Sequence, residues 1–207
     1  MKILVVLSLC AFGSFPFASC AQQTSPALPD APDPSAHRAV SPVYTPPTPT
    51  ERFRTYFRQT YSIPSLLEAG VHAGINQARD NPNEWPEGAE GYGDRFGSAA
   101  GEIIVRGTTE YALSAAFKED LRIRLCRGCD LGNKAKTAFE DTFTARKGED
   151  GHRAFSFARI VGPFAGSEVA DNTWYPSNGG RAESAKGVGL AFGMVFCRNL
   201  IREVVAR

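Results

Sequence analysis

Apolar residues recur every three or four positions along most of the chain after residue 52, which is the spacing of one face of an α-helix. In the first such segment Phe53, Phe57 and Tyr61 step by four. The longest segment spans residues 91–117, and we expect it to be the longest helix. Its inner face is predicted to carry Phe96, Ala100, Ile103, Gly107, Tyr111 and Ser114.

The same spacing predicts further helices over residues 65–79, 135–146, 155–171 and 183–205. On a second face of the longest helix, Glu102, Arg106 and Glu110 step by four and are expected to form a solvated charge ladder. No segment alternates β-branched and polar residues around a hairpin turn, which argues against an all-β fold. We therefore expect an all-α fold, a compact bundle of about five helices in residues 53–207.

Polar residues near residue 65 admit two interpretations. Ser65 and Glu68 have the spacing of a capping box at the start of a helix. Glu68 and His72 lie four apart on one helical face, so they could share a proton or a metal ion. A capping Glu68 and a partly exposed His72 account for the same residues more simply, and we expect these roles.

Small residues recur four apart in several of the predicted helices. Glycine inside a helix costs up to about 1 kcal/mol relative to alanine, so a repeated pattern must bring a compensating gain. The gain is close approach, because a row without side chains lets another backbone lie against the helix. We expect helix packing at Gly70, Gly74, Gly93, Gly97, Gly101, Gly162, Gly166, Gly189 and Gly193.

These rows are compatible with packing inside a membrane or in a tightly packed soluble bundle. The longest uncharged apolar run after the N-terminal segment, residues 187–197, rises only about 16 Å, half of a hydrocarbon core. The other predicted helices carry charged residues. A compact soluble or surface-associated bundle is therefore favoured.

The N-terminus has the composition of a secretory signal. A basic Lys2 precedes an apolar run over residues 3–17, and small residues follow. Cleavage after residue 21 would free a chain that begins at Gln22. Alternatively, residues 17–20 resemble a bacterial lipobox, in which a signal of residues 1–19 is removed and Cys20 is acylated and anchors the chain. Both alternatives place the protein outside the inner membrane, in the periplasm or at the outer membrane.

Residues 22–52 are predicted to be a disordered tether. Eight of the 14 prolines lie between residues 25 and 50, among Ala, Ser, Thr and Asp. Such a segment buries too little apolar surface to offset its ordering entropy, and proline favours an extended conformation.

Net charge excludes one class of partner. The chain has 23 basic and 22 acidic residues, a formal charge of +1. Without an excess of basic residues, counterion release cannot drive nucleic-acid binding, so we expect no nucleic-acid partner. An outer-membrane or envelope protein, or the membrane itself through an acylated Cys20, is the expected partner.

Cys126 and Cys129 form the sharpest local motif, a C-x-x-C. Oxidoreductases of the thioredoxin kind place this motif in a βαβ unit, which the sequence does not predict. A structural disulfide is therefore favoured over a thiol–disulfide oxidoreductase. One such pair without a second is weak support for zinc, and we expect no metal and no cofactor.

Three motifs resemble those of a group of exported proteins from soil bacteria. They are Asn-Pro-x-Glu-Trp-Pro-x-Gly-x-x-Gly-Tyr-Gly-x-Arg-Phe-Gly at residues 81–97, Phe-Ser-Phe-Ala-Arg-Ile-x-Gly at residues 155–162 and Trp-Tyr-Pro at residues 174–176. A Pro-Asp-Ala-Pro tether is common in that group, as in residues 28–34. The resemblance implies a shared helical fold and an envelope location, and it implies no activity and no catalytic residues.

The leading hypothesis is a non-enzymatic envelope protein that associates with a membrane or a protein partner. An alternative is a periplasmic cell-wall glycan hydrolase, which needs one carboxyl group kept protonated by apolar surroundings. Glu84 beside Trp85 and Glu90 close to Tyr92 are the candidate acids. Loop acids beside packed aromatic rings explain the same residues, so an enzyme is not favoured.

Overall fold

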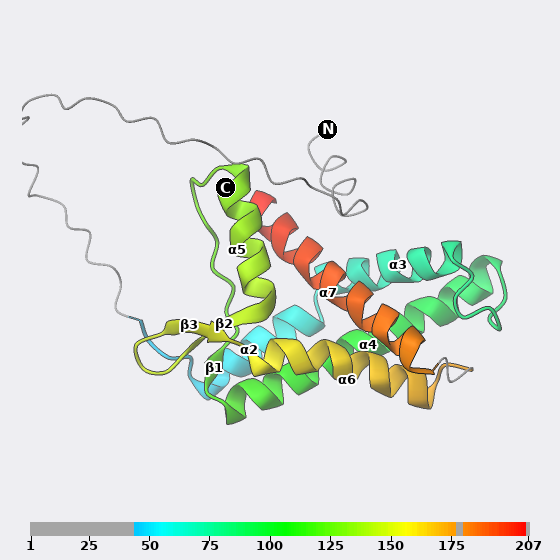
Figure 1. Cartoon of the computed structure of the whole chain (residues 1–207), viewed down its shortest axis with the longest axis horizontal. Coiled ribbons are helices and arrows are strands. Elements are labelled where there is room, and N and C mark those ends of the chain that lie inside the picture. The colour runs from blue at the N-terminus through cyan, green and yellow to red at the C-terminus, as the bar shows by residue number, and fades with distance from the viewer. Residues whose placement is uncertain (1–43, 177–179, 206–207) are drawn as a thin grey trace, which may run out of the picture. The chain divides into compact units, whose positions relative to one another are not determined.

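A computed structural model describes residues 44–176 and 180–205 of the protein. The expected signal peptide, Cys20 and the tether up to residue 43 lie outside the described residues. Thr45–Arg207 form one unit by their contacts, and helices make up most of its described part (Figure 1). The all-α class and the compact helical bundle expected from the sequence are thereby confirmed.

The first described helix, α2 (Pro49–Thr60), begins inside the range expected to be a disordered tether. The Thr48 hydroxyl accepts a hydrogen bond from the Glu51 N–H, and the Glu51 carboxylate accepts one from the Thr48 N–H at 2.8 Å. Proline is tolerated in the first turn, where its missing N–H would have no helical partner. The proline-rich composition therefore continues into the start of an ordered helix, and the expected boundary at residue 52 is wrong.

Most of the bundle is built around α4, the longest helix. The remaining helices are α3 (Ile63–Ala78), α4 (Gly88–Ala116), α5 (Leu131–Phe143), α6 (Phe157–Thr173) and α7 (Gly180–Val205). Helices α2, α3 and α6 pack against α4, and α7 packs against α5 and α6. Figure 1 shows α6 lying along α4. The expectation that the segment 91–117 is the longest helix is confirmed, with the helix beginning at Gly88 and ending at Ala116.

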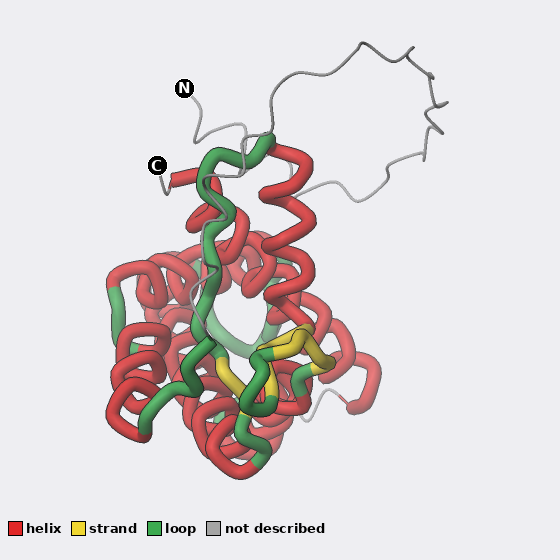
Figure 2. Tube along the Cα trace, turned by 90° about the vertical axis from the view of Figure 1, so that its left-hand side faces the viewer, coloured by secondary structure: helices red, strands yellow, loops and turns green. Residues whose placement is uncertain are grey.

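A small antiparallel sheet interrupts the helices, which the sequence pattern did not predict. It consists of β1 (Glu119–Asp120), β2 (Thr144–Lys147) and β3 (His152–Phe155), in that spatial order (Figure 2). Gly148 and Gly151 have positive φ in the turn between β2 and β3. Strands of two to four residues are too short to show alternation, so the end of α5 was expected to continue through β2.

The bundle has an unusual distribution of polar and apolar residues. Twelve apolar residues are buried among the described residues, and eight of them are alanines. One cluster of this core consists of Ala69, Ala99 and Ile103, with Phe96 packed against it. Larger side chains that are almost completely buried are polar or charged and include Arg95, Glu119, Asn199 and Glu203. Large apolar side chains are instead exposed on several helices. The interior of the bundle is therefore rich in polar and charged side chains.

Two of the expected glycine contacts join α6 to α4 closely. A Cβ placed on Gly166 would lie 2.9 Å from the Glu102 carbonyl oxygen, and one placed on Gly162 would lie 2.5 Å from Glu110 Cγ. Gly70 and Gly101 lie against aromatic side chains instead, because a Cβ would be 3.3 Å from the Tyr92 hydroxyl in the first case and 3.2 Å from the Trp174 ring in the second.

The remaining glycine expectations are wrong. They concern Gly74, Gly93, Gly97, Gly189 and Gly193. A Cβ placed on any of these five glycines would meet no other atom within 4 Å, so no neighbouring helix among the described residues lies against them. The spacing of these glycines is helical, but spacing alone does not place a partner against the row. Across the described residues, no helix combines the length and the apolar character needed to span a bilayer.

Candidate functional site

A network of charged side chains lies in the interior where α3, α4 and α7 meet. Arg106 Nη2 donates to Glu68 Oε1 at 2.8 Å, and Arg198 Nη1 donates to Glu68 Oε2 at 3.0 Å. His72 Nδ1 lies 4.0 Å from Glu102 Oε2. Glu68, His72, Glu102 and Arg106 are each at most 8% exposed. We call these four residues, together with Arg198, the buried network.

Sequence reasoning assigned the wrong environment to the members of this network. Helix α3 begins at Ile63, and the Ser65 hydroxyl donates to the Gln59 carbonyl at 2.5 Å instead of capping the helix. Glu68 therefore faces α4 from the second turn, and the expected capping box and partly exposed His72 are wrong. The expected solvated ladder on α4 is wrong as well, because α6 covers Glu102 and its neighbours.

Burial and neighbouring charges shift the pKa values within the network in different directions. Burial opposes ionisation of Glu68, but its two arginine partners lower the pKa of this carboxyl group to about 2. Burial lowers the pKa of His72 to about 4, against the charge of Glu68. Burial raises the pKa of Glu102 to about 7, against a hydrogen bond from Tyr175. At neutral pH the network holds an ionised Glu68, a neutral His72 and a partly protonated Glu102.

The space beside the network is too small for a substrate. The cavity there is about 10 Å³ and is lined in part by His72, Glu102, Ser167 and Met194. Such a volume holds no more than about one water molecule. The Ser167 hydroxyl is buried and has no hydrogen-bond partner in the described part of the chain, so a water there would satisfy it. The arrangement can share protons internally, but it cannot hold a glycan or a peptide.

Aromatic residues connect the end of α6 to this network. The Tyr175 hydroxyl donates to Glu102 Oε1 at 2.9 Å, and the Tyr175 ring stacks on Trp85 with centroids 5.3 Å apart. Trp174 Nε1 donates to Ser98 Oγ at 2.7 Å. The motifs at residues 81–97 and 174–176, which carry the resemblance noted in the sequence, are therefore in contact in the fold.

An open pocket lies on the surface of α4 beside these aromatic residues. Its volume is about 520 Å³, and it is lined by Trp85, Gly93, Asp94, Gly97, Ser98, Gly101 and Trp174. Gly93 and Gly97 are exposed at its floor, where the absence of side chains leaves the space open. We call this space the α4 pocket. The spacing of Gly93 and Gly97 identifies one helical face without side chains, but nothing in the sequence indicates that Trp174 lies beside it.

The candidate acids of the hydrolase hypothesis lie in solvent. Glu84 is exposed in the turn before α4, and Glu90 is exposed in the first turn of that helix. Neither has the apolar surroundings that keep a carboxyl group protonated. A buried carboxyl group with a raised pKa is present at Glu102, which the hypothesis did not name, but the cavity beside it has no room for a sugar ring.

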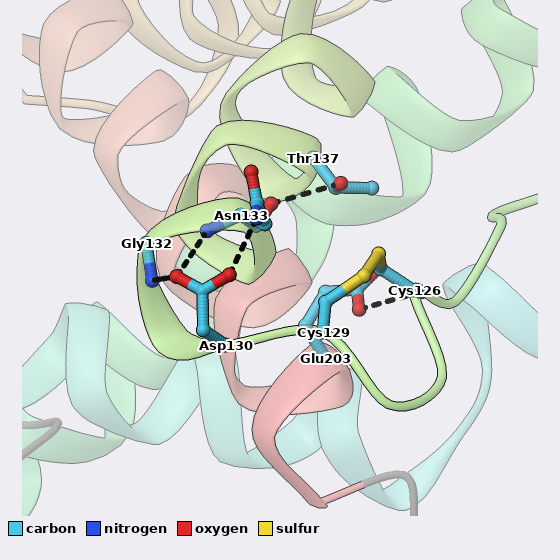
Figure 3. Close-up of a disulfide and its surroundings, with 7 residues drawn as sticks. All are labelled: Cys126, Cys129, Asp130, Gly132, Asn133, Thr137 and Glu203. Carbon is cyan, nitrogen blue, oxygen red and sulfur yellow. Dashed lines mark hydrogen bonds between the residues drawn. A yellow bond between two sulfur atoms is a disulfide. The ribbon is translucent and has the colours of Figure 1, made fainter. Parts of the chain in front are cut away.

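Cys126 and Cys129 are joined by a disulfide in the loop that precedes α5 (Figure 3). Asp130 follows directly and caps α5 by accepting a hydrogen bond from the Gly132 N–H at 3.0 Å. The Cys126 N–H donates to the buried carboxylate of Glu203 on α7 at 2.9 Å. This hydrogen bond joins the disulfide loop to α7, so the geometry favours a structural link between them.

Large apolar side chains form an exposed stripe along α2 and α3. The members lie one to four residues apart along the chain, and they are 43–74% exposed: Phe53, Phe57, Tyr61, Ile63, Leu66, Leu67 and Val71. We call this set the apolar face. Arg54 and Arg58 are exposed on the same helix, α2. The sequence showed the spacing of the aromatic residues but not their exposure.

Within the described residues, no three or more His, Cys, Asp or Glu side chains are grouped as a metal site would require. The buried network is instead a set of ion pairs and hydrogen bonds among two carboxylates, one imidazole and two guanidinium groups. Comparison of the chain with protein families, with curated proteins and with solved structures finds no match.

Proposed function

We propose that this chain is an exported cell-envelope protein whose helical domain binds a membrane surface and is not an enzyme. The observation that carries the proposal is the apolar face on α2 and α3. Seven exposed large apolar side chains on two consecutive helices are unusual on a protein that stays monomeric in water, and such a group marks a site for a partner or a membrane. Burying it in a bilayer interface removes this surface from water.

Charge and position favour a membrane over a protein as the occupant. An interfacial helix combines aromatic side chains on one face with arginine residues beside them, as α2 does with Phe53, Phe57, Arg54 and Arg58. Both helices directly follow the expected tether. A chain anchored at Cys20 would bring the start of the domain to the membrane first.

The interior supports a non-enzymatic role. Each charged group of the buried network is held by a partner from another helix, and the cavity beside it is about 10 Å³. The interior therefore holds the helices in register and offers no space to a substrate. Glycan hydrolysis at Glu84 or Glu90 and thiol exchange at Cys126 and Cys129 have less geometric support.

Vesicle sedimentation tests the membrane proposal. The chain that lacks the apolar signal of residues 1–19 and carries Cys20→Ser, which cannot be acylated, should sediment with vesicles of phosphatidylethanolamine and phosphatidylglycerol. Leu67→Ser in the apolar face should weaken this binding about tenfold, because inserting one leucine contributes about 1–2 kcal/mol.

The matched control is Leu131→Ser on α5, since Leu131 is 61% exposed and Leu67 is 66% exposed. This variant should change vesicle binding less than twofold. The proposal fails if the Cys20→Ser chain stays in the supernatant at millimolar lipid, or if both leucine variants weaken binding equally. Binding to a purified envelope protein instead of vesicles would also contradict it. Intact mass of the protein recovered from cells would separately distinguish cleavage before Gln22 from acylation at Cys20.

A further inference from the structure

The α4 pocket is distinct from the apolar face and has a different chemical character. Two indole side chains, Trp85 and Trp174, line it together with the exposed carboxylate of Asp94. Its floor is made by glycines of α4, and a Cβ added to Gly93 or Gly97 would meet no other atom within 4 Å. The pocket is therefore an open space beside aromatic rings and one negative charge.

The segment of the chain that includes Trp85 and Asp94 carries a net negative charge. The segment from residue 79 to residue 95 carries five acidic and two basic residues, which are Arg79, Asp80, Glu84, Glu87, Glu90, Asp94 and Arg95. The Arg95 side chain is 1% exposed and donates to backbone carbonyls of the preceding turn, including those of Asn81 and Pro82. Its charge is thus directed inward, and the exposed surface at this end of α4 is acidic.

The lining favours a cation over an anion or a neutral polar ligand. None of the lining residues in the described chain is basic, so an anion would meet only repulsion from Asp94. Trp174 Nε1 already donates to Ser98 Oγ, so this indole offers its ring and not its N–H. The Trp85 ring stacks on Tyr175 and has the Arg95 guanidinium 6.0 Å from its centroid, so the Trp174 ring is the aromatic surface that the pocket offers to a ligand. Aromatic faces and a carboxylate are the groups that bind organic cations.

We propose that the α4 pocket binds a compact organic cation, an alkylammonium or trimethylammonium group, against the Trp174 ring with Asp94 as its counter-ion. The volume of about 520 Å³ accommodates such a group together with part of the molecule that carries it. The same chemistry is found on a free amine and on a lysine side chain of a peptide. This proposal does not depend on membrane binding by the apolar face.

Titration of the full-length Cys20→Ser chain with choline chloride, followed by tryptophan fluorescence and by proton NMR of the ligand, tests the proposal. Choline should bind, and 3,3-dimethyl-1-butanol, its uncharged isostere, should bind at least tenfold more weakly. A parallel titration with Nα-acetyl-lysine amide distinguishes the free amine from a peptide side chain as the source. Failure of both cations to bind at 50 mM, or equal binding of the uncharged isostere, would overturn the proposal.

Two variants locate the binding in the pocket. Asp94→Asn should weaken choline binding at least fivefold, whereas Glu90→Gln, which removes the same charge one turn away outside the lining, should change it less than twofold. Gly97→Leu fills the floor and should abolish binding while the far-ultraviolet circular dichroism stays unchanged. Equal effects of Asp94→Asn and Glu90→Gln, or full binding by a folded Gly97→Leu protein, would show that the pocket is not the site.

Discussion

Two glycine rows with the same spacing lie on adjacent helices and meet opposite surroundings. On α6, Gly166 lies against the backbone of α4, where an added Cβ would be 2.9 Å from the Glu102 carbonyl oxygen. On α4, Gly93 and Gly97 face the open α4 pocket, where an added Cβ would meet no atom within 4 Å. Glycine spacing thus identifies a helical face without side chains, and the neighbouring element decides whether that face becomes a helix crossing or a pocket.

The close contact of the α6 glycines with α4 also explains why charged residues are buried. An added Cβ on Gly166 would lie 3.5 Å from Arg106 Cβ, so α6 crosses α4 directly over the residues of the buried network. A larger residue at this position would separate the two helices and admit water to Glu102 and Arg106. No helix in the described part of the chain covers Gly93 and Gly97, and the polar residue beside them, Asp94, is exposed to solvent.

Disrupting the buried network, which lies where Gly166 of α6 contacts α4, should have the largest effect on stability. Glu68→Ala leaves the guanidinium groups of Arg106 and Arg198 buried without their carboxylate, so the free energy of unfolding should fall by about 3–5 kcal/mol in urea titrations. The control is Glu90→Ala at the exposed start of α4, which should change the free energy of unfolding by about 0.5 kcal/mol or less. A loss below about 1 kcal/mol for Glu68→Ala would show that water reaches the network.

The second test uses the opposite pKa shifts of Glu102 and His72, two residues of the buried network. Glu102 has a pKa of about 7 in the folded protein and 4.5 ordinarily, so its stabilising contribution is complete below pH 4.5 and is lost as pH rises to about 7. His72 has a pKa of about 4 in the folded protein and 6.5 ordinarily, so its contribution is complete above pH 6.5 and is lost as pH falls to about 4. The two slopes oppose each other between pH 4.5 and pH 6.5.

Removing either group should therefore reveal the slope of the other. In Glu102→Gln, the free energy of unfolding should rise with pH over this window by about 1 kcal/mol per pH unit, and in His72→Gln it should fall by a similar amount. Urea titrations at pH 4.5, 5.5 and 6.5 measure both slopes, and the unmodified protein should show a much flatter profile. Identical profiles for all three proteins would mean that neither group titrates as its surroundings indicate.

The sequence predicted the helices well, because a repeat of three or four apolar positions over more than ten residues has one regular explanation. It failed at residues whose role depends on a distant segment. Glu68 and His72 have the spacing of a pair four residues apart, but Glu68 forms its ion pairs with Arg106 and with Arg198, which is 130 positions from Glu68. Strands of two to four residues also carried too little pattern to be recognised.

The two candidate surfaces were predictable to different extents. Phe53, Phe57 and Tyr61 showed the helical spacing of the apolar face, but spacing cannot tell a face that packs inward from one that faces solvent. For the α4 pocket, the glycines of its floor were visible, whereas the contact between residues 81–97 and residues 174–176 arises from the crossing of α6 over α4.

The smallest expected effect directly contrasts the two glycine rows. Gly97→Ala adds a methyl group into open space inside a helix, so the free energy of unfolding should rise by up to about 1 kcal/mol. Gly166→Ala gains the same helix propensity but forces the methyl group against the Glu102 carbonyl oxygen, and its net effect should be a loss of about 1–2 kcal/mol. Urea titrations of both variants at one pH measure the difference in sign. If both substitutions stabilise the protein, α6 can move away from α4 at little cost, and the close crossing would not be what keeps the charged network buried.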